Sequence, residues 1–107
     1  MDKKTMKGVG AGLAIGALAG AIAGILLAPK SGKETRADIA NYVGEMKDKI
    51  AKEIENAGEF TKDTYRKAVK KVVSAYEKGK KITAKQAKEI QDELDKNYDK
   101  VEKAAKK

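Results

Sequence analysis

The segment closest to a known chemical motif is GILLAPKS, from Gly24 to Ser31. It approaches the phosphate-binding loop GxxxxGK[ST], but Pro29 stands where that loop requires its second glycine, and no strand-like run precedes the segment. Nucleotide binding is therefore not expected. Asp92, Asp95 and Asp99 have helical spacing, but lysines surround them, which is typical of a solvated helix face rather than an acid–base pair.

The residue types exclude most other chemistry. The sequence contains no histidine, cysteine or tryptophan, and its only serines are Ser31 and Ser74. A zinc site and a nucleophile–histidine pair both lack the residues from which they are built. We therefore expect a protein that is not an enzyme, with no catalytic residues, no metal ligands and no cofactor.

Residues 8–29 carry no charge and predict a single transmembrane helix. At the α-helical rise this segment is about 33 Å long, which matches a hydrocarbon core of about 30 Å. Residues four apart share one helix face, and glycine allows a second backbone to approach that face closely. Glycine occupies every fourth position of the segment: Gly8, Gly12, Gly16, Gly20 and Gly24. This ladder predicts helix packing through self-association.

A cleaved secretory signal is the alternative reading of the N-terminal region. Residues 1–7 form a basic flank, and small residues ending at Ala19 or Ala23 resemble cleavage sites. However, the most apolar stretch, Ile25 to Leu27, follows both sites, whereas a signal peptide ends its apolar region before cleavage. An uncleaved anchor is the preferred interpretation.

Residues 30–36 form a basic junction after the uncharged segment. Pro29 interrupts the first helix, and Ser31 with Glu34 has the spacing of a capping box that starts the next one. Basic side chains at this depth can pair with lipid phosphates. The predicted headgroup contacts are Lys30, Lys33 and Arg36. The junction can also be a simple capped turn with a positive stop signal.

Residues 37–107 form a lysine-rich tail with an eleven-residue repeat. When the tail is divided into elevens from Ala37, the third, seventh and tenth positions are never charged. Such a repeat corresponds to about 3.67 residues per turn, so its apolar positions run almost straight along an amphipathic helix. The large apolar members define the tail stripe: Ile39, Val43, Met46, Ile50, Ile54, Val72, Ile90, Leu94 and Val101.

Breaks in the tail are expected near Gly58 and Gly79, and Thr83 with Gln86 forms a second capping box. Leucine, isoleucine, valine and phenylalanine make up only about 15% of the residues from Lys30 onward, below the roughly 20% that a charged chain needs to fold alone. We therefore expect an all-α protein with long amphipathic helices after the transmembrane helix. The tail should be non-globular or coiled-coil-like, without a compact monomeric core. Its stripe can pair helices within the molecule or in a homo-oligomer, lie on a lipid surface, or dock on a different protein.

The charge balance indicates the partners. Lysine and arginine number 24 against 16 acidic residues, a net charge of +8, which favours contact with anionic lipid headgroups. Basic residues alternate with acidic ones and no stacked aromatic surface is visible, so nucleic acid is not an expected partner. More basic residues follow the uncharged segment than precede it, which predicts a single-pass protein of the cell membrane with a cytoplasmic tail.

The run LLAPKSGKETR, from Leu26 to Arg36, together with the glycine-rich segment before it, resembles the YtxH family of small bacterial proteins. The resemblance implies a membrane-associated protein, often described as a general stress or gas-vesicle-like protein. It implies no catalytic residues.

Two functional classes follow from the sequence. The first is a membrane-anchored structural or scaffolding protein that acts through helix self-association or contact with the membrane surface. The second is a regulator that docks its tail stripe on a specific, unidentified protein partner. A third, an extracellular polycationic helix, requires cleavage of the N-terminal segment as a signal.

Overall fold

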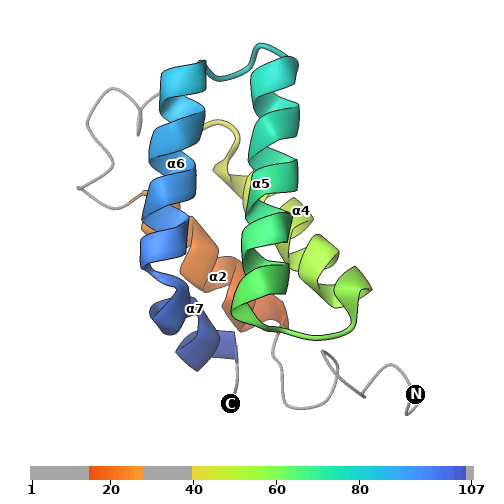
Figure 1. Cartoon of the computed structure of the whole chain (residues 1–107). Coiled ribbons are helices and arrows are strands. Elements are labelled where there is room, and N and C mark those ends of the chain that lie inside the picture. The colour runs from red at the N-terminus through yellow and green to blue at the C-terminus, as the bar shows by residue number, and fades with distance from the viewer. Residues whose placement is uncertain (1–14, 28–39, 106–107) are drawn as a thin grey trace.

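The computed structural model describes residues 15–27 and 40–105, and all of the regular structure in these ranges is α-helical (Figure 1). This confirms the predicted all-α class. The helices are α2 (Ile15–Leu26), α4 (Val43–Ala57), α5 (Lys62–Lys78), α6 (Ala84–Lys96) and α7 (Tyr98–Ala105).

The helices pack into a bundle in which α2 contacts three of the four other described helices. Helices α5 and α6 run side by side and antiparallel, joined by a short connection, and α4 packs along α5 (Figure 1). Helix α2 crosses the bundle and packs against α4, α6 and α7. Helix α7 packs chiefly on α2, so α2 links the first and the last helix of the tail.

The predicted non-globular tail is wrong. A continuous helix over residues 37–107 would be about 107 Å long, whereas the longest principal dimension of the molecule is 43 Å. The Cα radius of gyration is 13.4 Å, close to the roughly 13 Å of a compact chain of this length. The tail helices therefore fold back on one another and do not form an elongated rod.

The N-terminal segment completes the core that the tail lacks. Leu18, Ile22, Ile25 and Leu26 of α2 are buried in one cluster with the apolar faces of the tail helices. Each such side chain contributes about 1.5–3 kcal/mol on burial. Their sum is comparable with the whole net stability of a small domain, about 5–15 kcal/mol. The prediction that the chain has no compact core failed because it placed the α2 residues in the membrane. It then counted only the large apolar residues of the tail.

The chain turns where the sequence predicted it to turn. Helix α4 ends at Gly58, whose φ of 79° is the left-handed conformation that glycine adopts without steric cost. Helix α5 ends at Gly79. The left-handed residue there is the next one, Lys80, with φ 60°.

Helix α2 lies inside the predicted transmembrane segment. Its 12 residues extend only about 18 Å. Among the helices of residues 15–27 and 40–105, none has both the length and the apolarity to cross a membrane. The remainder of the predicted span, residues 8–14 and 28–29, lies outside the described residues.

Candidate functional site

Helix α2 has two different faces. Its large side chains point into the bundle, where Leu18 and Ile22 are fully buried. Gly16, Gly20 and Gly24 share the opposite face and are exposed. We call these three residues the glycine face. The other two members of the predicted ladder, Gly8 and Gly12, lie outside the described residues.

The glycines of this face are not needed for packing against the described part of the chain. A Cβ atom added at any of the three would meet nothing within 4 Å. Leu27, the residue that follows α2, is 46% exposed. The described structure therefore leaves an uncharged face of small residues open, on a chain that is otherwise rich in charge.

The tail stripe lies in the core of the bundle. Every member of the stripe within the described residues is buried: Val43, Met46, Ile50, Ile54, Val72, Ile90, Leu94 and Val101. Ile39 lies outside them. Some other uncharged repeat positions are exposed, and these lie at helix ends: Ala57, Thr61, Gly79 and Thr83. The repeat is thus a series of separate helix faces joined by turns.

Two capping boxes begin α5 and α6. The Thr83 hydroxyl accepts the backbone N–H of Gln86 at 3.1 Å, and the Gln86 side chain accepts the backbone N–H of Thr83 at 3.0 Å. Thr61 and Thr64 make the same reciprocal pair at the start of α5. The box at α5 was not predicted from the sequence, because Thr64 stands at the N3 position, where Glu or Gln is usual.

The predicted junction lies outside the described residues. This holds for the cap residues Ser31 and Glu34 and for the headgroup residues Lys30, Lys33 and Arg36. Their roles stay predictions. Half of the near-match to a phosphate loop also lies outside the described residues, since only its first four residues, from Gly24 to Leu27, are described.

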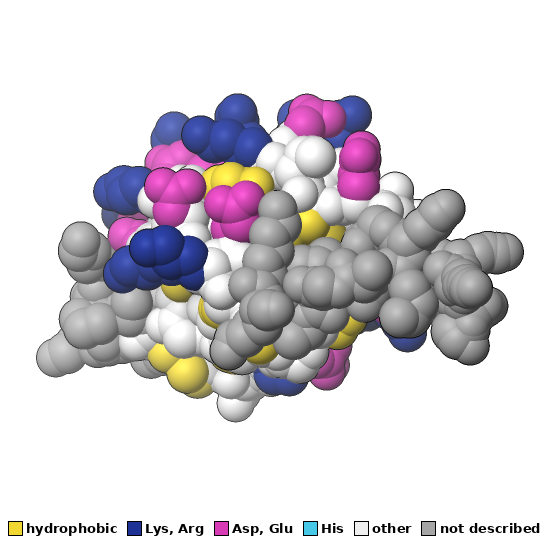
Figure 2. Space-filling view, turned by 90° about the horizontal axis from the view of Figure 1, so that it is seen from below, with side chains coloured by type: hydrophobic (Ala, Val, Ile, Leu, Met, Phe, Trp, Pro, Cys, Tyr) yellow, Lys and Arg dark blue, Asp and Glu magenta, His cyan; other side chains and the backbone are white. Residues whose placement is uncertain are grey.

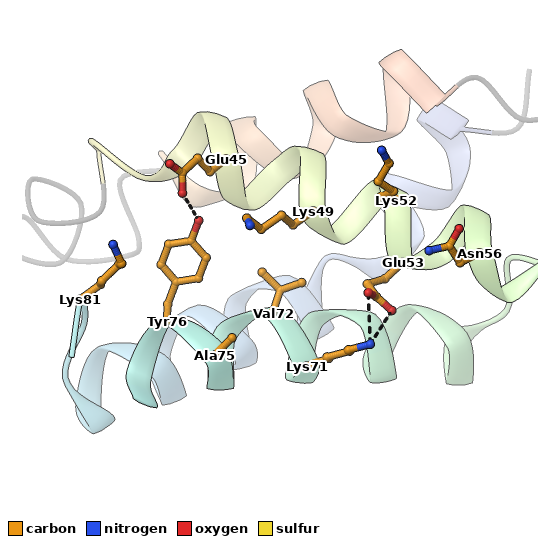
Figure 3. A pocket seen from close by; sticks show the side chains of 10 residues that line it. All are labelled: Glu45, Lys49, Lys52, Glu53, Asn56, Lys71, Val72, Ala75, Tyr76 and Lys81. Atoms are coloured by element: carbon orange, nitrogen blue, oxygen red, sulfur yellow. Dashed lines mark hydrogen bonds and ion pairs between the residues drawn. The ribbon is translucent and has the colours of Figure 1, made fainter. Parts of the chain in front are cut away.

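A groove of about 490 Å³ lies between α4 and α5 (Figure 3). Its floor includes Val72 and Ala75, and charged side chains of both signs surround it. The lining residues are Glu45, Lys49, Lys52, Glu53, Asn56, Lys71, Val72, Ala75, Tyr76 and Lys81.

Hydrogen bonds and ion pairs across this groove join α4 to α5. The Tyr76 hydroxyl donates to the Glu45 carboxylate, and burial together with this bond raises the pKa of Tyr76 to about 12. Lys71 Nζ lies 3.2 Å from Glu53 Oε2. Two of the groove's acidic groups are therefore engaged in holding helices together. In residues 15–27 and 40–105 no cluster of three or more His, Cys, Asp or Glu side chains could hold a metal ion.

A second polar cluster joins α5 to α6. The Tyr65 hydroxyl is buried and donates to the Leu94 carbonyl at 2.7 Å. Burial is the main cause that raises the pKa of Tyr65, and the nearby charge of Asp95 raises it further. Its ring packs against those of Phe60 and Tyr98, with centroids 6.0 Å and 5.3 Å away. Tyr65 occupies a seventh position of the eleven-residue repeat, but its hydrogen-bond partner lies 29 residues away and has no signal in the sequence.

Asp92 and Asp95, near the end of α6, lie close to different basic side chains. Arg66 Nε lies 3.6 Å from one oxygen of Asp95, and the other oxygen is buried with no hydrogen-bond partner in the described structure. Burial raises the pKa of Asp95, although the Arg66 charge opposes the shift. Asp92 lies 4.0 Å from Lys88 on the exposed side. Asp92 and Asp95 are thus paired with Lys88 and Arg66, respectively.

On the face drawn in Figure 2, Lys and Arg side chains are interspersed with Asp and Glu side chains.

Comparison with known proteins yields one match. The family model described as YtxH-like protein matches residues 11–107, a range that includes α2 and all of the tail helices. No curated protein matches the chain, and no solved structure matches it. The family resemblance of the glycine-rich segment and of residues 26–36 is therefore confirmed.

Proposed function

This chain belongs to the YtxH-like protein family, and we propose that it is a non-enzymatic structural or scaffolding protein of the bacterial cell membrane. It associates with the bilayer through the segment that contains α2 and with copies of itself through the glycine face. The basic tail remains on the cytoplasmic side. A role during stress, which the family resemblance implies, is part of this proposal.

The glycine face is the observation on which this function mainly depends. Gly16, Gly20 and Gly24 are exposed, and no described side chain would contact a Cβ added to them. Exposed glycine in a helix interior costs roughly 0.5–1 kcal/mol each relative to alanine. Three such residues at four-residue spacing are better explained by close approach of another helix.

The charge of the chain supports contact with lipid. The net charge is +8, so an anionic membrane surface attracts the protein as a whole. This attraction brings the uncharged segment, residues 8–29, close to the bilayer, and the segment is long enough to insert into the hydrocarbon core.

The alternative function, a regulator that docks its tail stripe on another protein, has less support. Docking requires an exposed apolar stripe, whereas the described stripe residues are buried within the bundle. We therefore do not favour this function for the folded bundle.

Crosslinking in membranes tests the self-association. The double variant Gly16→Leu, Gly20→Leu should lose its crosslinked dimers, because leucine side chains keep the second backbone away. The control Gly44→Leu adds the same side chain at an exposed position of α4 where a Cβ meets nothing. It should keep its dimers. Equal crosslinking of parent, double variant and control would show that the glycine face is not an interface.

Flotation with vesicles tests the membrane association. The full-length protein should float with vesicles of phosphatidylcholine and phosphatidylglycerol in equal amounts, and part of it should resist extraction with high salt because apolar contacts are not screened. A protein that stays entirely in the aqueous fraction would contradict the proposal.

A further inference from the structure

Helix α2 is covered by the chain's own tail on its bulky side. Leu18 and Ile22 are fully buried, and Leu26 is 2% exposed. The helices that pack against α2 are α4, α6 and α7. The residues of α2 most suited to lipid are thus already occupied in the bundle.

The covering helices carry charges on their outer faces. Lys49 and Lys52 of α4 are exposed, as are Lys88 and Asp92 of α6 and Lys100 of α7. A charged side chain is strongly disfavoured in the hydrocarbon core of a bilayer. Helix α2 therefore cannot enter hydrocarbon while these helices remain packed on it.

We infer that the bundle and the membrane-inserted state are mutually exclusive, and that the tail helices act as an intramolecular cover for the membrane-seeking helix. This inference depends on the proposed membrane function. When α2 leaves for the bilayer, α4, α6 and α7 lose the partner that fills their common core. Their apolar faces, including Ile54 and Val101, then become free for the membrane surface or for another copy.

The arrangement couples membrane affinity to the stability of the bundle. Only the opened fraction of the protein can insert, so the apparent membrane affinity is the intrinsic affinity multiplied by that fraction. A substitution that loosens the bundle without touching α2 must raise membrane binding. A bundle that binds lipid intact would show no increase.

Two Gly→Ala substitutions outside α2 test this coupling with no change in charge. Gly58 has a φ of 79°, where alanine is strained, so Gly58→Ala should loosen the α4–α5 turn and raise the vesicle affinity about 5- to 30-fold. Gly44 lies exposed inside α4, and alanine there favours the helix. Gly44→Ala is the matched control, and its vesicle affinity should stay equal or fall.

Tyr65→Phe provides a second loosened variant. It removes the buried hydrogen bond from α5 to the Leu94 carbonyl and retains the apolar ring. Its vesicle affinity should rise about 5- to 30-fold, in step with its loss of stability. Chemical denaturation of each full-length variant in solution supplies the stability scale.

The outcomes separate the inference from the proposed function. Affinity for the mixed vesicles that rises as stability falls supports the cover. Parent and loosened variants that bind vesicles equally, or loosened variants that bind less, would overturn the inference and leave the membrane function standing. No binding of parent or variants would overturn both.

Discussion

Helices α2 and α5 belong to one bundle but are built from opposite kinds of residues. Both bury one apolar face: Ile22 in α2 and Val69 in α5 are each fully buried. The other face of α2 is the uncharged glycine face, whereas the other face of α5 carries exposed lysines such as Lys67 and Lys70. Burial of an apolar face thus explains why both helices join the bundle. The two helices differ in the face that they expose to their surroundings. The exposed face of α5 is charged, whereas the exposed glycine face of α2 is not.

The largest expected effect separates the two faces of α2. Ile22→Asp places a charge in the core and should cost more than about 4 kcal/mol in the free energy of unfolding, enough to abolish the bundle. Gly20→Asp introduces the same side chain on the exposed face and should cost less than about 1 kcal/mol. Urea denaturation followed by circular dichroism measures both. Similar losses in the two variants would refute the two-faced description.

A smaller effect is expected on the inner face of α5. Tyr65→Phe should destabilise the bundle by about 1–2 kcal/mol, because the buried hydroxyl donates to the Leu94 carbonyl at 2.7 Å. Tyr98→Phe is the control, since the Tyr98 hydroxyl lies 3.4 Å from Glu102 and is only partly buried. It should change the unfolding free energy by less than about 0.5 kcal/mol. A larger loss for Tyr98→Phe would show that the hydrogen bond to Leu94 is not the important one.

The end of α5 should accept a stabilising change of about 1 kcal/mol. The Lys81 N–H donates to Tyr76 O and the Lys80 N–H donates to Glu77 O, both at 2.9 Å, so Lys80 occupies the left-handed position of a Schellman motif. Lys80→Gly should therefore raise the midpoint of thermal unfolding.

The adjacent substitution Lys78→Gly is the matched control for this change. It removes the same charge but places glycine in the last turn of α5, which should lower the midpoint. A gain or a loss shared by both variants would assign the effect to charge rather than to backbone conformation.

The smallest effect concerns Asp95 and depends on pH. Burial raises the pKa of Asp95 in the folded state, so folding favours the protonated form of this side chain. The stability that the protonated form contributes is fully present below the ordinary Asp pKa. It is lost as the pH rises through the raised pKa of the folded state. Asp95→Asn should therefore gain stability relative to the parent at neutral pH, and the gain should shrink toward acid. Arg66 is 62% exposed at its side chain, so loss of its ion pair costs little. A gain that does not vary between neutral and acid denaturation curves would contradict this.

Local features of the fold were predictable from the sequence. The all-α class, the turns near Gly58 and Gly79 and the Thr83–Gln86 capping box depend on residues only a few positions apart. The end of α6 at Asn97 was not predicted. Asn97 there donates its side-chain amide to the Glu93 carbonyl at 2.8 Å, and no glycine or proline marks the site.

The sequence alone determined the helices, their apolar faces and the excess of positive charge, because periodicity and composition are properties of short segments. Only the tertiary structure decided which faces meet. It placed α2 in the core that the tail residues could not fill alone, and it turned Gly16, Gly20 and Gly24 outward. The physical reason is that an uncharged helix lowers its free energy by burial in lipid or in protein, and its sequence does not distinguish the two.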